Sequence, residues 1–357
     1  GVRGGIVAGV LFVLPSLFIL SGLTWVYLTY GDVSAVSGVL YGIKPAVTAI
    51  VLFAAYRIGS KALSNNILRA VAVLAFIAIF TLEIPFPYIV LSAALIGFFG
   101  AQFSPSTFTT GSHHGAGTEG YGPALIDDDT PIPDHAKFKW SRLVGFFVVG
   151  VGIGLAVMSL LSNPVLHNMG EFFTKAAMVT FGGAYAVLPY IYQGGVVDYN
   201  WLTSTQMMDG LALGETTPGP LIMVVAFVGF VGAWTKEIFG PEALLLAGFA
   251  GASIATLFTF LPSFLFIFLG GPGVESTRGD LKFSAPLSAV TAAVVGVIIN
   301  LAVFFAQNVL WPTGGDLDLI AALIGVAAFV ALFRFKIGIM SVLGACAAIG
   351  LGLMVLA

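Results

Sequence analysis

The sequence has few charged residues and almost no cysteine. Only 9% of its 357 residues are Asp, Glu, Lys or Arg, whereas soluble domains carry roughly a quarter. The single cysteine, Cys346, excludes a disulfide framework and implies no thiol chemistry. The formal net charge of −3 says little about partners, and no feature suggests nucleic-acid binding. A signal-peptide pattern is also missing. Because the sequence has neither a catalytic triad nor a nucleotide-binding loop, we expect no enzyme, no catalytic residue and no cofactor.

The chain is instead rich in apolar residues, at 58% of the total and with a mean hydropathy of +1.03. Stretches of about 20 such residues mark helices that can cross a membrane. Eleven stretches meet this description: 5–29, 40–59, 66–82, 85–103, 142–161, 172–192, 205–234, 241–270, 283–306, 317–334 and 336–356. The sequence therefore predicts an all-α polytopic protein of the lipid bilayer.

The basic residues predict its orientation. Of the 14 Lys and Arg residues, eleven lie at alternate loop ends, whereas only Lys236 lies at the opposite ends. This bias places the first set in the cytoplasm of a multi-pass protein of the plasma (inner) membrane. The loop 193–204 has no Lys or Arg although it should be cytoplasmic. It moves outside if 172–192 and 205–234 both re-enter the membrane instead of spanning it.

One apolar stretch is interrupted at Leu211-Ala-Leu-Gly-Glu-Thr-Thr-Pro-Gly-Pro-Leu221. Lipid leaves no water for loose backbone groups, so a broken helix is tolerated only beside protein or a polar cavity. Broken helices of this kind form the substrate sites of secondary transporters. A Pro-Gly pair can also kink a helix against its neighbour. Two prolines, a glycine and Glu215 within six residues favour the broken helix.

An internal repeat predicts two related halves. Phe12-Val-Leu-Pro-Ser-Leu-Phe18 recurs as Thr259-Phe-Leu-Pro-Ser-Phe-Leu265, and Lys44-Pro-Ala-Val-Thr-Ala-Ile50 matches Ala285-Pro-Leu-Ser-Ala-Val-Thr291. The charge rule gives the copies opposite orientations, so we expect an inverted-topology repeat of helical halves with broken helices. The second copy has two segments before its Leu-Pro-Ser helix that the first copy lacks. We therefore expect an N-terminal portion before Gly1.

The predicted organisation has four parts. Residues 1–103 form the C-terminal part of the first repeat, 104–141 a cytoplasmic polar linker, 142–161 a connecting transmembrane helix, and 162–357 the second repeat. The linker carries His113, His114, Asp127, Asp128, Asp129 and His135. It is either a metal or regulatory site or a flexible connection, and we favour the connection because no spacing fixes a coordination geometry. No metal site is predicted.

Two further runs carry a resemblance to a known family. They are Phe173-Thr-Lys-Ala-Ala-Met-Val-Thr-Phe-Gly-Gly-Ala-Tyr-Ala-Val-Leu-Pro-Tyr190 and Gly210-Leu-Ala-Leu-Gly-Glu-Thr-Thr-Pro-Gly-Pro-Leu-Ile-Met223. With Leu261-Pro-Ser263 and Tyr41-Gly-Ile-Lys-Pro-Ala46, they resemble the two-domain chromate ion transporters over nearly the whole chain except the linker. The Phe-Gly-Gly and Pro-Gly-Pro elements of the first copy are absent here. The resemblance implies chromate efflux and chromate resistance, with sulfate as a competitor.

The residues around the break suit a tetrahedral dianion. A half-helix after Pro218, Gly219 and Pro220 would present backbone N–H groups and a positive dipole end, and Thr216 and Thr217 would add hydroxyl donors. Glu215 is either a proton-linked switch or an acceptor for loose N–H groups at the break. These residues, together with Lys175, Gly182 and Gly183, form the predicted substrate site.

The preceding segment is expected to add to this site as one continuous helix. Lys175, Gly182, Ala186 and Pro189 would then lie close to one face, and the glycine pair would let an anion approach the backbone. Lys175 either supplies charge to the site or extends to the membrane interface, as we also expect for Lys44.

These features together predict a secondary transporter for a divalent oxyanion, chromate or a sulfate-like ion, with chromate efflux favoured. One alternative is an uptake permease for sulfate or another anion, and a weaker one is a membrane-embedded enzyme or scaffold. The sequence leaves a homodimer open.

Overall fold

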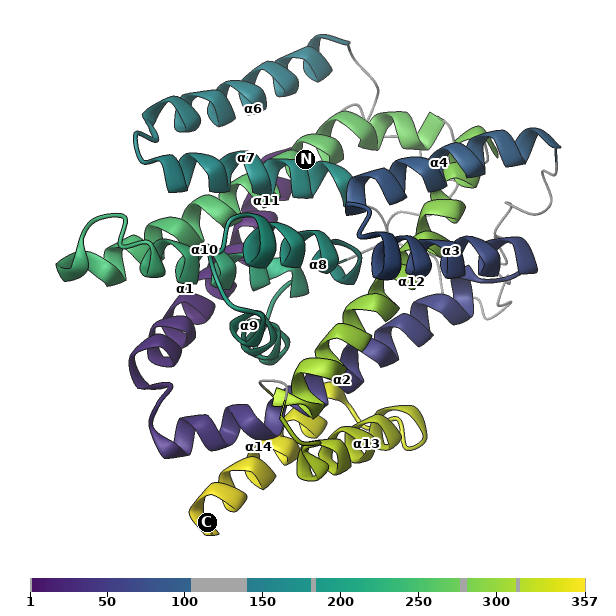
Figure 1. The fold of residues 1–357 in the computed structure, drawn as a ribbon. Helices are drawn as coiled ribbons and strands as arrows, with labels where there is room; N and C mark the ends of the chain where they lie inside the picture. The colour runs from purple at the N-terminus through teal and green to yellow at the C-terminus, as the bar shows by residue number, and fades with distance from the viewer. Residues whose placement is uncertain (1, 104–139, 181–183, 277–280, 313–314, 357) are drawn as a thin grey trace, which may run out of the picture.

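The computed structural model describes residues 2–103, 140–180, 184–276, 281–312 and 315–356, and these residues contain thirteen α-helices. The first copy of the repeat comprises α1 (Val2–Tyr30), α2 (Ser34–Ala62), α3 (Asn66–Leu82) and α4 (Phe86–Phe103). Helix α6 (Trp140–Leu160) follows and lies at the edge of the molecule (Figure 1). The linker 104–139, with all of its His and Asp residues, lies outside the described part of the chain.

The predicted second copy follows α6. It comprises α7 (Pro164–Val179), α8 (Ala184–Tyr192), the π-helix η1 (Gln193–Asp198), α9 (Ser204–Thr216), the short η2 (Leu221–Met223), α10 (Val224–Thr235), η3 (Pro241–Ala243), α11 (Leu244–Ser276), α12 (Leu281–Leu310), α13 (Leu319–Phe333) and α14 (Ile339–Leu356).

Polar residues at the helix starts explain several of these boundaries. Asn163 accepts a hydrogen bond from the Val165 N–H at 2.9 Å, and Pro164 occupies the first helical position of α7. Thr203 and Gln206 form a reciprocal capping box at the start of α9. Asp318 caps α13 through the Ala321 N–H at 2.8 Å and accepts the Tyr41 hydroxyl of α2. The last contact ties the two copies together.

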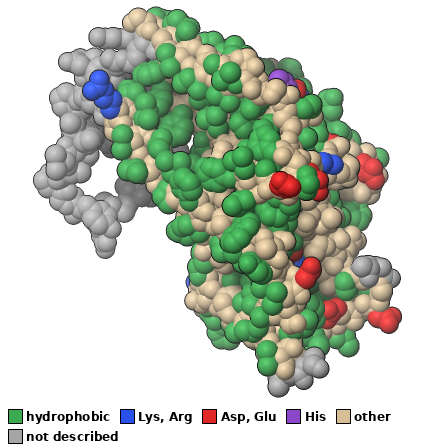
Figure 2. All heavy atoms as spheres, turned by 90° about the vertical axis from the view of Figure 1, so that its left-hand side faces the viewer, with side chains coloured by type: hydrophobic (Ala, Val, Ile, Leu, Met, Phe, Trp, Pro, Cys, Tyr) green, Lys and Arg blue, Asp and Glu red, His purple; other side chains and the backbone are tan. Residues whose placement is uncertain are grey.

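The helices confirm an all-α polytopic membrane protein. Six are long and apolar enough to cross a membrane, and four shorter apolar helices match four further predicted segments. Apolar side chains cover much of the face in Figure 2, as expected of a surface that meets lipid. The remaining predicted segment, 172–192, is divided among α7 and α8.

Contacts between the copies follow the predicted repeat. Gly5 of α1 lies beside Phe268 of α11, Gly9 beside Phe264, and Phe18 stacks on Phe249, so α1 and α11 run antiparallel. Helices α2 and α12 also run antiparallel. Arg57 near the end of α2 shares a cavity with Ser288 at the start of α12, and Pro45 near the start of α2 shares another with Leu310 at the end of α12.

Helices α2 and α12 each also pack against the last two helices of the other copy within the same chain. Helix α12 packs against α3 and α4, and α2 packs against α13 and α14. The contacts allow close backbone approach: a Cβ at Gly42 of α2 would lie 2.0 Å from the Cys346 carbonyl of α14. The contacts of α12 with α3 and α4 in the first copy thus correspond to those of α2 with α13 and α14 in the second, as expected of an inverted repeat.

Candidate functional site

The predicted break in the helix is present. Helix α9 ends at Thr216, and helical structure resumes only at Leu221. Between them, Gly219 has φ +134°, a backbone conformation that residues with a side chain rarely adopt. Residues 217–220 therefore form a non-helical connection from the end of α9 to η2 and the buried helix α10.

The Leu-Pro-Ser motif of the first copy contacts this break. The Ser16 hydroxyl of α1 donates a hydrogen bond to the Pro218 carbonyl. A Cβ on Gly219 would lie 1.7 Å from the Ser16 Oγ, which leaves room only for glycine. The repeated motif of one copy thus satisfies a carbonyl freed by the broken helix of the other.

Glu215 accepts a hydrogen bond from the Tyr185 hydroxyl of α8. The carboxylate is half-buried at the end of α9, one turn before the Pro-Gly-Pro sequence. The donor in the structure is a side chain, whereas one of the two sequence-based readings expected backbone N–H donors from the break. Glu215 therefore links α9 to α8.

Tyr185 also lines a cavity of about 550 Å³ between α2, α8 and α12. Arg57 and Lys61 of α2 lie at this cavity and are exposed, while Ser288 and Thr291 of α12 add hydroxyl groups. Ile50 and Ala54 of α2 give the cavity a buried apolar wall. The two exposed cations can attract an anion, while the hydroxyl protons of Tyr185 and Thr291 are donated to Glu215 and to the Leu287 carbonyl and would have to be released to bind it.

The threonine hydroxyls of the break have local partners. Thr216 is exposed and its hydroxyl donates to the Leu213 carbonyl at 2.9 Å. Thr217 is buried and donates to the Gly214 carbonyl at 2.9 Å. Each hydroxyl proton is thus engaged within α9, so an anion would have to displace these bonds to use either group as a donor.

The prediction of one continuous helix from 172 to 192 was wrong. Helix α7 ends at Val179, and the next residue, Thr180, is extended with ψ 103°. The Thr180 hydroxyl donates to the Ala176 carbonyl at 2.5 Å and so competes with the backbone for this acceptor. The helical spacing that placed Lys175, Ala186 and Pro189 on one face does not continue across this end.

The other predicted residues of this segment are placed only in part. The Lys175 side chain is 60% exposed and its ammonium lies 2.5 Å from the Glu171 carboxylate on α7. It does not line the cavity at Tyr185. Gly182 and Gly183 lie outside the described residues, and their role in the site stays a prediction.

Lys44 differs from its expected extension toward the membrane interface. Its ammonium lies 3.5 Å from Asp209 Oδ1 of α9, and the Asp209 side chain is only 3% exposed. Sequence analysis missed this pair, together with Tyr185 as the partner of Glu215. The available signal was Asp209 itself, since an acidic residue within an apolar membrane segment is a functional candidate by default.

A metal centre is not formed by the residues that the structure places. Among them, no group of three or more His, Cys, Asp or Glu side chains could hold a metal ion.

The fold and this site define a membrane transporter built from inverted repeats around a broken helix. The chain belongs to the chromate transporter family, whose sequence model matches residues 1–98 and 167–351.

Curated relatives agree with this assignment. The chain is 27% identical over 337 residues to the chromate transport protein of Cupriavidus metallidurans, covering 93% of this chain and 71% of the relative. It is 28% identical over 334 residues to the probable chromate transport protein of Synechococcus elongatus, covering 94% and 72%. It is 28% identical over 319 residues to the chromate transport protein of Pseudomonas aeruginosa, covering 87% and 66%. No solved structure matches the chain.

Proposed function

We propose that this protein is a secondary transporter of divalent oxyanions that carries chromate out of the cell across the plasma membrane. The observation that carries the proposal is the cavity with Arg57 and Lys61, connected to the broken helix through the Tyr185–Glu215 hydrogen bond. The printed names of three relatives, each a chromate or probable chromate transport protein, support chromate as the substrate.

In the proposed site, the anion enters the cavity from the side of Arg57 and Lys61. It then reaches the break, where Glu215, Thr216, Thr217, Pro218, Gly219 and Pro220 surround its path. By the charge rule the end of α2 and the start of α3 face the cytoplasm, so this cavity is the inner vestibule, and the linker 104–141 is cytoplasmic. Lys175, with its charge beside Glu171, would contribute only if that pair separates.

The direction of transport follows from the membrane potential. Moving one charge across 100 mV releases about 2.3 kcal/mol, so a dianion that leaves a negative-inside cell gains roughly 4.6 kcal/mol. Export therefore needs no coupled ion, whereas uptake of the same anion must be driven by one. Chromate efflux of this kind would give chromate resistance.

Flux measurements test the proposal. The protein, expressed from its complete gene, is reconstituted into liposomes loaded with radiolabelled chromate, and a potassium gradient with valinomycin sets the potential. We expect efflux above that of empty liposomes, faster at a larger inside-negative potential and competed by sulfate but not by chloride. Absence of chromate flux, or sulfate flux without chromate flux, would contradict chromate as the substrate and favour the sulfate permease.

A further inference from the structure

The structure has a second polar cavity that is separate from the one lined by Arg57. It has a volume of about 300 Å³ and is formed by the end of α1, the start of α2 and the start of α9. Its lining includes the charged residues Asp32, Lys44 and Asp209, together with the Tyr27 hydroxyl. The two cavities involve opposite ends of α2, since Lys44 and Arg57 are separated by about 20 Å along that helix.

Asp209 is the buried ionisable group of this cavity. The Tyr27 hydroxyl donates to its Oδ2 at 2.9 Å, and the Lys44 ammonium lies 3.5 Å from its Oδ1. Oδ1 is buried and accepts no hydrogen bond from the described residues. Among the described residues, the Lys44 ammonium is therefore the group that compensates the charge of Oδ1, and a bound proton would do so in its place.

The surrounding charges favour a proton over an anion or a metal cation. Asp32, Asp209 and Lys44 together carry a net charge of −1, which repels a dianion. Helices α10 and α14, which also lie near α9 and α2, bring no charged side chain from their described residues, and the one titratable group of α14 is Cys346. A metal cation at Oδ1 would face the Lys44 ammonium at close range, whereas a proton neutralises the carboxylate without occupying the cavity.

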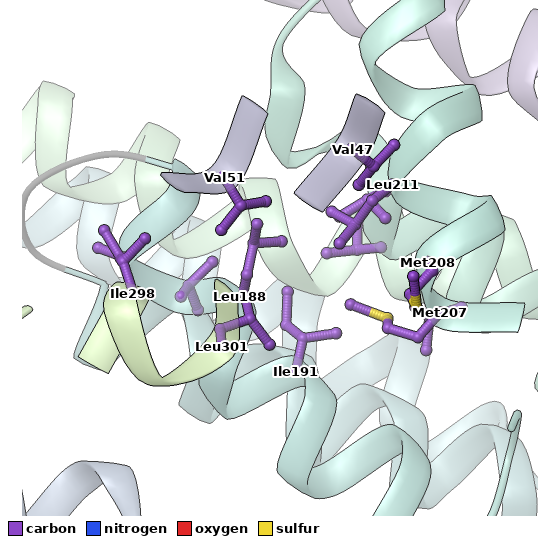
Figure 3. Close-up of a cluster of buried hydrophobic side chains, with 14 of the residues drawn as sticks. Val47, Val51, Leu188, Ile191, Met207, Met208, Leu211, Ile298 and Leu301 are labelled. Atoms are coloured by element: carbon purple, nitrogen blue, oxygen red, sulfur yellow. The ribbon is translucent and has the colours of Figure 1, made fainter. Parts of the chain in front are cut away.

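Helix α9 connects the two cavities. Asp209 and Glu215 lie six residues apart, about 9 Å along the helix axis. Asp209 lines the second cavity, and Glu215 accepts a hydrogen bond from Tyr185, which lines the first. Helix α9 also packs into the buried core, where its residues Met207 and Leu211 lie in one apolar cluster with Val47 and Val51 of α2, Leu188 of α8 and Ile298 of α12 (Figure 3). A change in the Lys44–Asp209 pair therefore acts on the helix whose end forms the broken segment.

We propose that Asp209 Oδ1 is a proton-binding site that couples pH to anion transport through α9. In the unprotonated state the carboxylate holds Lys44 and keeps α1, α2 and α9 together. Uptake of a proton from the cavity water gives a neutral carboxyl group and releases Lys44, whose charge is then free to face the cavity. Loss of the proton to water on the opposite side of the membrane restores the pair. This inference rests on the proposed function only in using anion flux as a readout.

The test compares the complete protein with its Asp209→Asn variant in sodium-free liposomes containing a pH-sensitive dye. For the wild type we expect chromate flux to change by about threefold over the pH unit centred on the midpoint, approaching the limit of about tenfold for one protonation only away from it, and to be accompanied by proton movement. Asp209→Asn should lose both the pH dependence and the proton movement. Glu242→Gln, which removes an exposed carboxylate in η3, is the control and should keep the wild-type pH profile.

Two further measurements keep the test decisive if Asp209→Asn folds poorly. Tyr27→Phe removes the donor to Oδ2 and destabilises the carboxylate form, so the midpoint of the flux should move to higher pH. Infrared difference spectra of the purified protein should show a protonated carboxyl band that Asp209→Asn lacks, independently of flux.

The outcomes separate this inference from the proposed function. Wild-type chromate flux without proton movement or pH dependence, or a wild-type pH profile in Asp209→Asn, would overturn the inference and leave the function standing. Proton-coupled flux of sulfate alone, lost in Asp209→Asn, would support the inference and overturn chromate as the substrate. An identical carboxyl band in both proteins would overturn the inference.

Discussion

The central helices of the two copies, α2 and α12, share a sequence frame but differ in chemistry. Aligned on Pro45 and Pro286, the basic residues Lys44, Arg57 and Lys61 of α2 correspond to Ala285, Ile298 and Ala302 of α12. The three α12 residues are buried, and Ile298 belongs to a buried apolar cluster (Figure 3). The two helices thus share a frame, while α2 supplies charge at these positions and α12 supplies buried apolar side chains.

The Leu-Pro-Ser helices differ in the same way. The Ser16 hydroxyl of α1 donates to the Pro218 carbonyl of the other copy, whereas the Ser263 hydroxyl of α11 donates to the Thr259 carbonyl within its own helix at 3.3 Å. Identical tripeptides therefore act differently, because only Ser16 faces a broken helix among the described residues. Substitutions that make the copies more alike test whether these differences matter for transport.

The largest effect is expected where the first copy touches the break. Gly219→Val places a side chain on a residue with φ +134° and into the Ser16 hydroxyl, so the Pro-Gly-Pro connection must move. Chromate flux should fall to the level of empty liposomes, while membrane insertion persists. Gly22→Val in α1 is the control, since a Cβ there meets no atom within 4 Å. Normal flux in Gly219→Val would show that the substrate does not pass the break between α9 and η2.

Giving α2 the residues of α12 should have the next largest effect. The double variant Arg57→Ile with Lys61→Ala removes both cations from the cavity, and attraction between a dianion and two nearby charges makes a loss on the order of 100-fold in flux reasonable. Lys236→Ala with Arg334→Ile removes two exposed cations elsewhere and serves as the control. Equal flux in both double variants would show that the cavity charges do not act on the substrate.

Sequence analysis could predict those features that one segment carries by itself. The broken helix follows from Pro218, Gly219 and Pro220, and the inverted repeat follows from the duplicated motifs and the loop charges. The Tyr185–Glu215 bond and the Lys44–Asp209 pair depend on which distant helices meet, and no local pattern encodes that. The end of α7 was missed because residues 172–192 are an apolar run that resembles one helix. Thr180 and the nearby pair Gly182 and Gly183 have low helix propensity and were the available signal for a break.

Removal of the Tyr185 hydroxyl should have an intermediate effect. A hydrogen bond to a charged group contributes about 1.5–3 kcal/mol, so Tyr185→Phe should lower flux by roughly 10-fold or more through the loss of its bond to Glu215. The comparison is Tyr192→Phe on the same helix, whose hydroxyl bonds Ser204 at 3.0 Å instead. Similar flux in Tyr185→Phe and Tyr192→Phe would show that the bond between Tyr185 and Glu215 does not contribute to transport.

The smallest effect is expected from the two repeated serines, Ser16 and Ser263, which are compared directly. Ser16→Ala removes one hydrogen bond to the break, worth about 0.5–1.5 kcal/mol, and should lower flux a few-fold. Ser263→Ala removes a bond within α11 and should leave the flux near that of the wild type. A larger effect from Ser263→Ala would show that the difference between the two copies has been misread.

The most direct measurement of the central claim is an experimental structure of the protein with bound tungstate, a heavy tetrahedral dianion. The account predicts density for the ion in the cavity lined by Arg57, Lys61 and Tyr185, on the path to Gly219. Density for the ion only beside Lys175 or on the linker, with this cavity empty at saturating tungstate, would contradict it.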